Sequence, residues 1–375
     1  MYVFGPMLKE GIKKFVTYQV GGDSLENQIT RRYSDFFALR EKLQERWPGI
    51  YIPNVPPKKA VGNTDTKTIE KRERMLNIFC FKLSTLPYLF NSEEVKVFKT
   101  AGTETAKAIQ ALPKVSYEEI KNRYSQSFEN YDDGYDLIFG LNRLNDFNEY
   151  LKGYQTNIKQ FQESVNKSLD KKKHQIERYL HLLVGLAEHE KNTLLVYSQN
   201  QDEDKLVISN PKNNELYEKI VNLKESLVNP FITLNDWLDE EQVDIEAMLE
   251  AMASLKGLET TKTKLNQKLE TLTSDIENFK SSGKKTFTMM FKNSDNAITE
   301  MEKEKETTEN NIQFIGEIQK MAAFNMEWYV ERFKKEKTYE YFRHFKAFVN
   351  LQRKNTVTID NLWKTVKNCM VGLEP

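Results

Sequence analysis

Two adjacent arginines stand directly before a tyrosine at Arg31-Arg32-Tyr33, a combination suited to binding an anion. A guanidinium carries forked donors that match pairs of phosphate oxygens, and the neighbouring ring offers a flat floor for a ligand. Alone, the motif is equally compatible with a solvated charge beside a core aromatic residue. The elements around it must therefore supply the other parts of a phosphate site.

Charge is unevenly distributed along the 375-residue chain. Residues 1–105 hold 17 Lys and Arg against 12 Asp and Glu, a net charge of +5, whereas the whole chain has a net charge of zero. The remaining residues therefore carry −5, and the N-terminal third is the part expected to meet an anionic partner. The length allows two domains, and the 29% of charged residues with only 15 Gly suits long, polar-faced helices.

The first hundred residues predict a small α+β domain. A β-rich run at 15–20 and a short strand ending at Ile29 are followed by helical spacing from Ser34 to Trp47. The proline-rich stretch 53–57 predicts an extended, polyproline-like segment. Helical spacing then resumes over 69–83, with a basic start. The arginine pair thus lies where a strand gives way to a helix.

The rest of the chain predicts long helices and no strands. Apolar residues from Leu151 to Val165 recur three and four residues apart, as in the seam of a coiled coil. Three helices are expected. The first reaches about residue 199, the second covers 213–282 with a kink or interruption at Pro230, and the third covers 293–353, followed by a separate amphipathic segment at 358–370. Because a bundle that thin leaves much of its apolar seam exposed, we expect it to associate with a second copy or a related chain.

No motif supports catalysis, a resident metal or a cofactor. The sequence has no glycine-rich phosphate loop, no Cys-x-x-Cys pair and no His-Glu-x-x-His. His181 and His189 can share a helix face but lack a third ligand at a fitting interval, and Cys80 and Cys369 lie far apart. No apolar run approaches the ~20 residues that span a bilayer. We therefore expect a protein that is not an enzyme and whose membrane contact, if any, is peripheral.

The order of features in residues 1–100 resembles the phox-homology (PX) phosphoinositide-binding domain. The resemblance rests first on the run Arg31–Phe36. It also rests on a Pro-x-x-Pro stretch followed by a lysine, and on a basic helix start four residues before Leu76. In that family the arginine before the tyrosine binds the 3-phosphate and the aromatic ring packs under the inositol. The later lysine and arginine hold the 1-phosphate and the ring hydroxyls, respectively. The implied phosphoinositide site is Arg32, Tyr33, Lys58 and Arg72.

Two expectations concern the surroundings of this site. Arg31 is expected to face outward into solvent. The loop from Lys59 to Thr68, which dips into lipid in that family, offers only Ala60 and Val61 as apolar residues. Membrane insertion by this loop should therefore be shallow.

The remaining two-thirds of the chain resembles the BAR domain that follows PX in sorting nexins, where three long kinked helices form a crescent-shaped dimer. The stretch 324–353 and Trp363 look like the last helix of that domain. The predicted organisation is a PX domain at 1–105, an acidic and partly helical linker at 106–136, and a BAR-like three-helix domain at 137–375. The predicted fold class is an α+β PX domain with a three-stranded sheet, followed by an all-α coiled-coil domain.

The helical region departs from the family pattern in its charge. Segment 117–136 is acidic where sorting nexins usually carry a membrane-inserting amphipathic helix, and an anionic bilayer would repel it. The clearest cationic element is the turn between the second and third long helices, which lies at the crescent tip in a BAR fold. Residues expected to touch a membrane, or equally a partner protein, are Lys284, Lys285, Phe287, Met290 and Phe291.

The resemblance implies a phosphoinositide-binding peripheral membrane protein of sorting-nexin type. It would read phosphatidylinositol 3-phosphate on the cytoplasmic face of endosomal membranes and act in membrane trafficking or remodelling. It would form a homodimer, or a heterodimer with a related PX–BAR chain, and bind no nucleic acid. The alternative is a PX–BAR-like scaffolding or lipid-contacting subunit of a larger membrane complex, for example a mitochondrial one, which the acidic linker and helical region motivate.

Overall fold

The computed structural model describes residues 1–375 except 11–13, 23–27, 59–64, 129–130, 133, 195, 197–205, 211, 283–293 and 372–375, with backbone alone at 282 and 294–297. The chain divides into two compact units. Unit 1 holds Met1–Tyr154 and Val243–Phe333, and unit 2 holds Gln155–Gln242 and Lys334–Pro375. Each unit is described by itself below.

Unit 1 begins with a three-stranded antiparallel sheet in the order β1-β2-β3. The strands are β1 (Tyr2–Lys9), β2 (Phe15–Gly21) and β3 (Ile29–Arg32). Valine, threonine and aromatic residues dominate β2, as expected for a strand with a buried face, and Tyr18 and Val20 are fully buried. The register places Thr17 opposite Arg32, which aligns the end of β3 with the start of β2. The predicted three-stranded α+β domain is confirmed.

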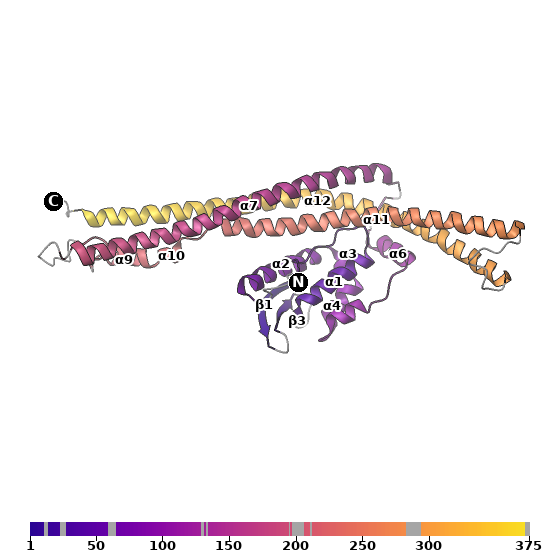
Figure 1. The fold of residues 1–375 in the computed structure, drawn as a ribbon, viewed down its shortest axis with the longest axis horizontal. Helices are drawn as coiled ribbons and strands as arrows, with labels where there is room; N and C mark the ends of the chain where they lie inside the picture. Colours follow the sequence, from indigo (N-terminus) through magenta and orange to yellow (C-terminus); the bar gives the residue numbers. More distant parts are fainter. Residues whose placement is uncertain are drawn as a thin grey trace. The chain divides into compact units, whose positions relative to one another are not determined.

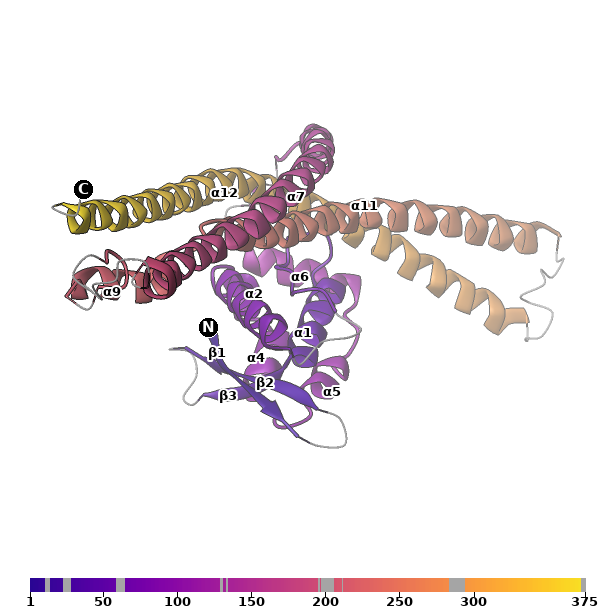
Figure 2. The ribbon, with the colours of Figure 1, turned by 60° about the vertical axis from the view of Figure 1, so that its left-hand side comes forward.

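Among the described residues, six helices follow the sheet, and several of them lie against one of its faces (Figure 2). They are α1 (Tyr33–Arg46), α2 (Thr66–Ser84), α3 (Pro87–Phe90), α4 (Glu93–Thr100), α5 (Thr105–Gln110) and α6 (Tyr117–Ser127). The helix α1 begins directly after β3 because the Asp35 carboxylate accepts a hydrogen bond from the Arg32 backbone N–H at 2.8 Å. Phe36 of α1 is fully buried between Phe79 and Phe98, with ring centroids 6.4 and 5.1 Å away. Burial of one such ring stabilises the fold by ~1.5–3 kcal/mol.

The helix α6, which lies in the predicted acidic linker, packs its apolar face on α1 and α3. Tyr124 is fully buried and stacks on Trp47 at 5.7 Å, and its hydroxyl donates to the Pro48 carbonyl. Phe128 meets the Tyr88 ring edge-on at 5.4 Å. The apolar side of α6 is therefore already occupied by protein.

A buried ion network holds α6 and α4 onto α1. Glu94 is fully buried, and its carboxylate lies 2.7 Å from Arg46 Nε and 2.9 Å from Arg123 Nη1. Arg46 is 2% exposed and also reaches Glu93 at 2.7 Å. Two arginines and two glutamates balance one another, which makes burial of these charges tolerable.

The sheet-containing part of unit 1 is joined to residues far along the chain. The Tyr51 ring stacks on Tyr329 at 4.1 Å, and its hydroxyl donates to the buried Asp244 carboxylate, which also pairs with Lys82 at 2.6 Å. Gly49 has a φ of +83°, and a Cβ there would lie 3.0 Å from Leu258. Glycine is favoured at this turn because the positive φ strains any L side chain and the Leu258 side chain leaves little room for a Cβ.

Long helices make up most of the rest of the described structure, with short helical segments between two of them (Figure 1). They are α7 (Leu137–His189), a π-helical turn η1 (Glu190–Leu194), α9 (Asn214–Val221), α10 (Leu223–Ser226), α11 (Phe231–Ser282) and α12 (Ser294–Met370). This arrangement confirms the predicted long helical region. No helix in the described ranges combines the length and the apolarity needed to cross a membrane.

The prediction of a separate final segment at 358–370 is wrong, because α12 runs unbroken from Ser294 to Met370. Helix propensity alone predicts that a helix ends near residue 355. Asn355, however, is buried and donates its side-chain amide to the Val228 carbonyl at 2.7 Å. A tertiary contact thus sustains the helix where its local sequence is weak.

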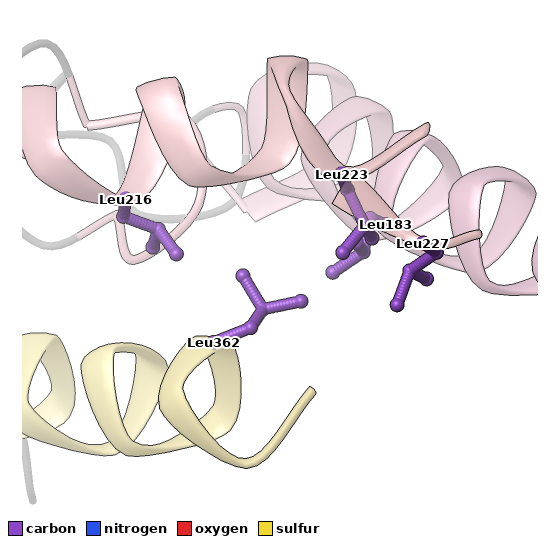
Figure 3. Close-up of a cluster of buried hydrophobic side chains, with 5 residues drawn as sticks. All are labelled: Leu183, Leu216, Leu223, Leu227 and Leu362. Carbon is purple, nitrogen blue, oxygen red and sulfur yellow. The ribbon is translucent and has the colours of Figure 1, made fainter. Parts of the chain in front are cut away.

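Unit 2 is held by a cluster of buried leucines from segments far apart in the sequence (Figure 3). The members are Leu183, Leu216, Leu223, Leu227 and Leu362. Nearby, the Glu190 carboxylate accepts hydrogen bonds from the backbone N–H groups of Ile208 at 2.9 Å and Ser209 at 2.7 Å. This bond fastens the end of α7 to the segment that leads into α9.

We predict that Glu94→Gln destabilises the protein by about 3–5 kcal/mol, because it breaks the buried ion pair with Arg46 and leaves Glu93 alone to balance two arginines. The measurement is the midpoint of urea-induced unfolding, followed by tryptophan fluorescence. Glu104→Gln is the matched control, since the Glu104 side chain is 69% exposed and its ion pair with Lys107 lies at the surface. Equal midpoints for Glu94→Gln and the unsubstituted protein would contradict the prediction.

Candidate functional site

The two arginines at the end of β3 point to opposite faces of the sheet, as successive strand residues must. Arg31 is 4% exposed, whereas Arg32 is exposed. Only Arg32 is therefore placed to meet a ligand from solvent.

The prediction that Arg31 faces outward is wrong. Its Nε and Nη2 atoms donate to the Phe98 carbonyl at 2.9 and 2.6 Å, and Nη2 also donates to the Ala101 carbonyl at 2.9 Å. These acceptors lie at the C-terminal end of α4, where backbone carbonyls lack partners within the helix and carry the negative end of the helix dipole. Burial lowers the pKa of Arg31. Its five N–H donors nevertheless let the guanidinium be buried here with its hydrogen bonds made.

Tyr33 and Arg72 are in direct contact. The Arg72 guanidinium carbon lies 4.4 Å from the centroid of the Tyr33 ring, and Arg72 is 6% exposed. The Tyr33 hydroxyl donates to the Pro56 carbonyl at 2.5 Å, which fixes the ring against the proline-rich stretch. Burial raises the pKa of Tyr33, and the nearby positive charge of Arg72 opposes that shift. Asp65, the N-cap of α2, accepts from the Thr68 backbone N–H at 2.9 Å and so fixes the first turn of the helix that carries Arg72.

Lys58 and Arg32 also lie on aromatic rings. Lys58 Nζ is 3.3 Å from the centroid of Phe37, whose ring is tilted against Tyr33 at 6.3 Å. The Arg32 guanidinium carbon is 3.7 Å from the centroid of Phe15, on the neighbouring strand. The structure thus joins Lys58 to Tyr33 through Phe37, and places the head of Arg32 over Phe15.

Phe15 and Phe37 were missed as possible site residues from the sequence. Phe37 follows Tyr33 by four residues, so a helix places both rings on one face, and this spacing could have found it. Phe15 is the diagonal neighbour of Arg32 across β2 and β3, since Thr17 is its direct partner. That contact depends on the strand register, which the sequence does not state.

The arrangement can bind a phosphorylated ring. Guanidinium and ammonium groups placed on neutral rings keep N–H donors for phosphate oxygens, and such charge-assisted bonds are the strong ones. Within the described parts of the chain, no group of three or more His, Cys, Asp or Glu could hold a metal ion.

Other predicted contact residues lie outside the described residues. These are Lys284, Lys285, Phe287, Met290 and Phe291 in the turn before α12, and Ala60 and Val61 in the loop after Lys58. Their roles stay predictions.

Comparison with known proteins places residues 19–100 in the PX domain family. Sorting nexin 1 of Arabidopsis thaliana is 35% identical over 107 residues, which cover 26% of this chain and 27% of the relative. Sorting nexin MVP1 of Saccharomyces cerevisiae is 34% identical over 119 residues, or 31% of this chain and 23% of the relative. The matched region thus spans about a quarter of each curated relative.

Among solved structures, the cryo-EM structure of the SNX-BAR Mvp1 tetramer has a similar fold. The TM-score is 0.58, and the match covers 97% of this chain and 99% of that one. At 17% sequence identity this similarity concerns the fold alone. It includes the long helices as well as the sheet-containing region.

We predict that Arg31→Lys lowers stability by about 2 kcal/mol, because an ammonium cannot reproduce the forked bonds to two carbonyls. Arg32→Lys is the control, since it makes the same change at the adjacent, exposed position. Thermal unfolding of both variants measures the difference. A loss for Arg32→Lys as large as that for Arg31→Lys would show that burial does not distinguish the two arginines.

Proposed function

The chain belongs to the sorting-nexin family, and from this premise we propose that it is a phosphoinositide-binding peripheral membrane protein that acts in membrane trafficking. Its ligand is phosphatidylinositol 3-phosphate, met at the cytoplasmic face of endosomal membranes. The function is binding and scaffolding, without an enzymatic step.

The observation that carries the proposal is a set of three cations, each lying on an aromatic ring: Arg72 on Tyr33, Lys58 on Phe37 and Arg32 on Phe15. Arg32 is exposed and takes the 3-phosphate, and the Tyr33 ring lies under the inositol. Lys58, at the end of the proline-rich stretch, takes the phosphate that links the headgroup to its lipid.

The burial of Arg72 supports a singly phosphorylated headgroup. Arg72 is 6% exposed and its guanidinium lies over the Tyr33 ring, so at most an edge of the group is open to a ligand. An exposed edge of the guanidinium can donate hydrogen bonds to the ring hydroxyls. A second phosphate would need a cation with more of its donors exposed, because those donors must replace the water molecules that hydrate the phosphate.

Exposed apolar side chains on the helices of unit 1 support assembly with a second PX–BAR chain, either identical or related. Ile138, Phe139 and Trp328 are 74, 61 and 55% exposed. A groove of about 910 Å³ also lies on this unit, and its apolar lining includes Leu141, Leu144, Leu249 and Met252. Exposed apolar patches of this kind mark interaction surfaces. Two linked headgroup sites would bind a membrane with avidity.

We expect Arg32→Ala to reduce flotation with vesicles that contain phosphatidylinositol 3-phosphate by about tenfold or more, because a charge-assisted contact to the phosphate is lost. Lys96→Ala is the control, since it removes one exposed charge from α4 of the same unit. Flotation with phosphatidylcholine vesicles alone gives the background. If Arg32→Ala binds these vesicles as strongly as the unsubstituted protein does, the proposed phosphoinositide-binding function is refuted.

We expect Phe139→Asp to shift the protein from dimer to monomer in sedimentation velocity, because it places a charge in the proposed apolar interface. Val371→Asp is the control, because Val371 is 79% exposed but belongs to unit 2. A monomeric unsubstituted protein would refute dimerisation. Stable co-migration with integral membrane subunits in mild detergent would instead support the role in a larger complex.

A further inference from the structure

We propose that Phe37 is a positioning residue of the headgroup site, and that its ring holds the Lys58 ammonium where it meets a lipid phosphate. This inference rests on the proposed function. Phe37 lies outside the residues that the family motif names.

Two separate contacts fix Lys58. Its Nζ atom lies 3.3 Å from the centroid of the Phe37 ring. Its backbone follows the proline-rich stretch, which is tied to α1 by the hydrogen bond from Tyr33 to the Pro56 carbonyl. Phe37 is one helical turn from Tyr33, so one helix face holds both the proline-rich stretch that leads to Lys58 and the Lys58 ammonium.

A ring holds a cation differently from a carboxylate. The attraction comes from the ring quadrupole, so the ammonium keeps its full charge and its remaining N–H donors. An acidic partner would instead compete with the phosphate for the same donors. Lysine also has a flexible four-carbon stem, and holding it before binding reduces the ordering cost at the moment the lipid arrives.

The other two cations of the site also lie on aromatic rings. The Arg72 guanidinium carbon is 4.4 Å from the Tyr33 centroid, and that of Arg32 is 3.7 Å from the Phe15 centroid. Three cations from β3, α2 and the proline-rich stretch are thus each held by a ring. Rings also support cations outside the site, as at Lys99 and Phe90, so the Lys58 contact is assigned to the site by its link through Phe37 to Tyr33.

Phe37 is not a member of the core. Its neighbour Phe36 is fully buried between Phe79 and Phe98, whereas Phe37 is only half-buried. Leucine at position 37 is also apolar, so it keeps the packing of this part of α1. It has no aromatic ring, so it removes the quadrupole that attracts the Lys58 ammonium. The substitution therefore separates cation positioning from folding.

The test is a double-mutant cycle of the full chain on phosphatidylcholine vesicles that contain phosphatidylinositol 3-phosphate. Phe37→Leu should weaken binding about three- to fivefold, and Phe37→Tyr should restore it because tyrosine keeps the ring face. In the Lys58→Ala background, Phe37→Leu should cause no further loss. An equal loss in both backgrounds, or tighter binding by Phe37→Leu, would overturn the inference.

A measurement without lipid separates this inference from the proposed function. In protein with ¹³C-methylated lysines, the Lys58 resonance, assigned through Lys58→Arg, should show an upfield ring-current shift that Phe37→Leu abolishes. If the unsubstituted protein fails to bind the vesicles, the proposed function fails and the lipid role of Phe37 fails with it. If binding persists but the Lys58 resonance is the same in both proteins, only the role of Phe37 is refuted.

Discussion

The alternation of side chains at the end of β3 is the constraint on which the candidate site depends. It sends Arg31 inward to the C-terminal carbonyls of α4 and leaves Arg32 outside. The inner arginine fastens the strand, the outer one is left for a ligand, and Tyr33 starts the next helix directly beside them. One structural arginine and one binding arginine are thus adjacent in sequence but have unrelated surroundings. A shift of one residue in this strand would exchange their positions.

Aromatic rings hold the cations of the site without cancelling their charge. Paired with carboxylates, Arg32 and Lys58 would be better fixed but less able to attract phosphate. Elsewhere in unit 1, arginines are paired with carboxylates instead of rings. Where α6 packs on α1, Glu93 and Glu94 neutralise Arg46 and Arg123. Arg46 and Arg123 are paired with acids, whereas the charges proposed to bind the lipid lie on rings. The distinction matches the different tasks.

Periodicity predicted most of the fold, and a motif predicted the candidate site residues. The spacing from Ser34 to Trp47 predicted α1 to within about one residue at each end, because local apolar spacing decides a helix. Features that depend on distant partners were not predictable in this way. The acceptors of Arg31 lie on α4, the ring under Arg32 depends on strand register, and α12 continues past Asn355 through a bond to Val228. Each of these requires knowledge of which segments meet in space.

The turn at Gly49 has a consequence for the order in which the protein folds. Its N–H donates to Ser254 at 2.9 Å, and neighbouring Tyr51 packs on Tyr329. On the ribosome, the N-terminal region is complete long before α11 and α12 emerge. Its surface around Tyr51 must therefore stay uncovered while most of the chain is still being made. Closing contacts over so large a sequence separation is slow, so unit 1 completes its folding only after α11 and α12 are made, well after its sheet is synthesised.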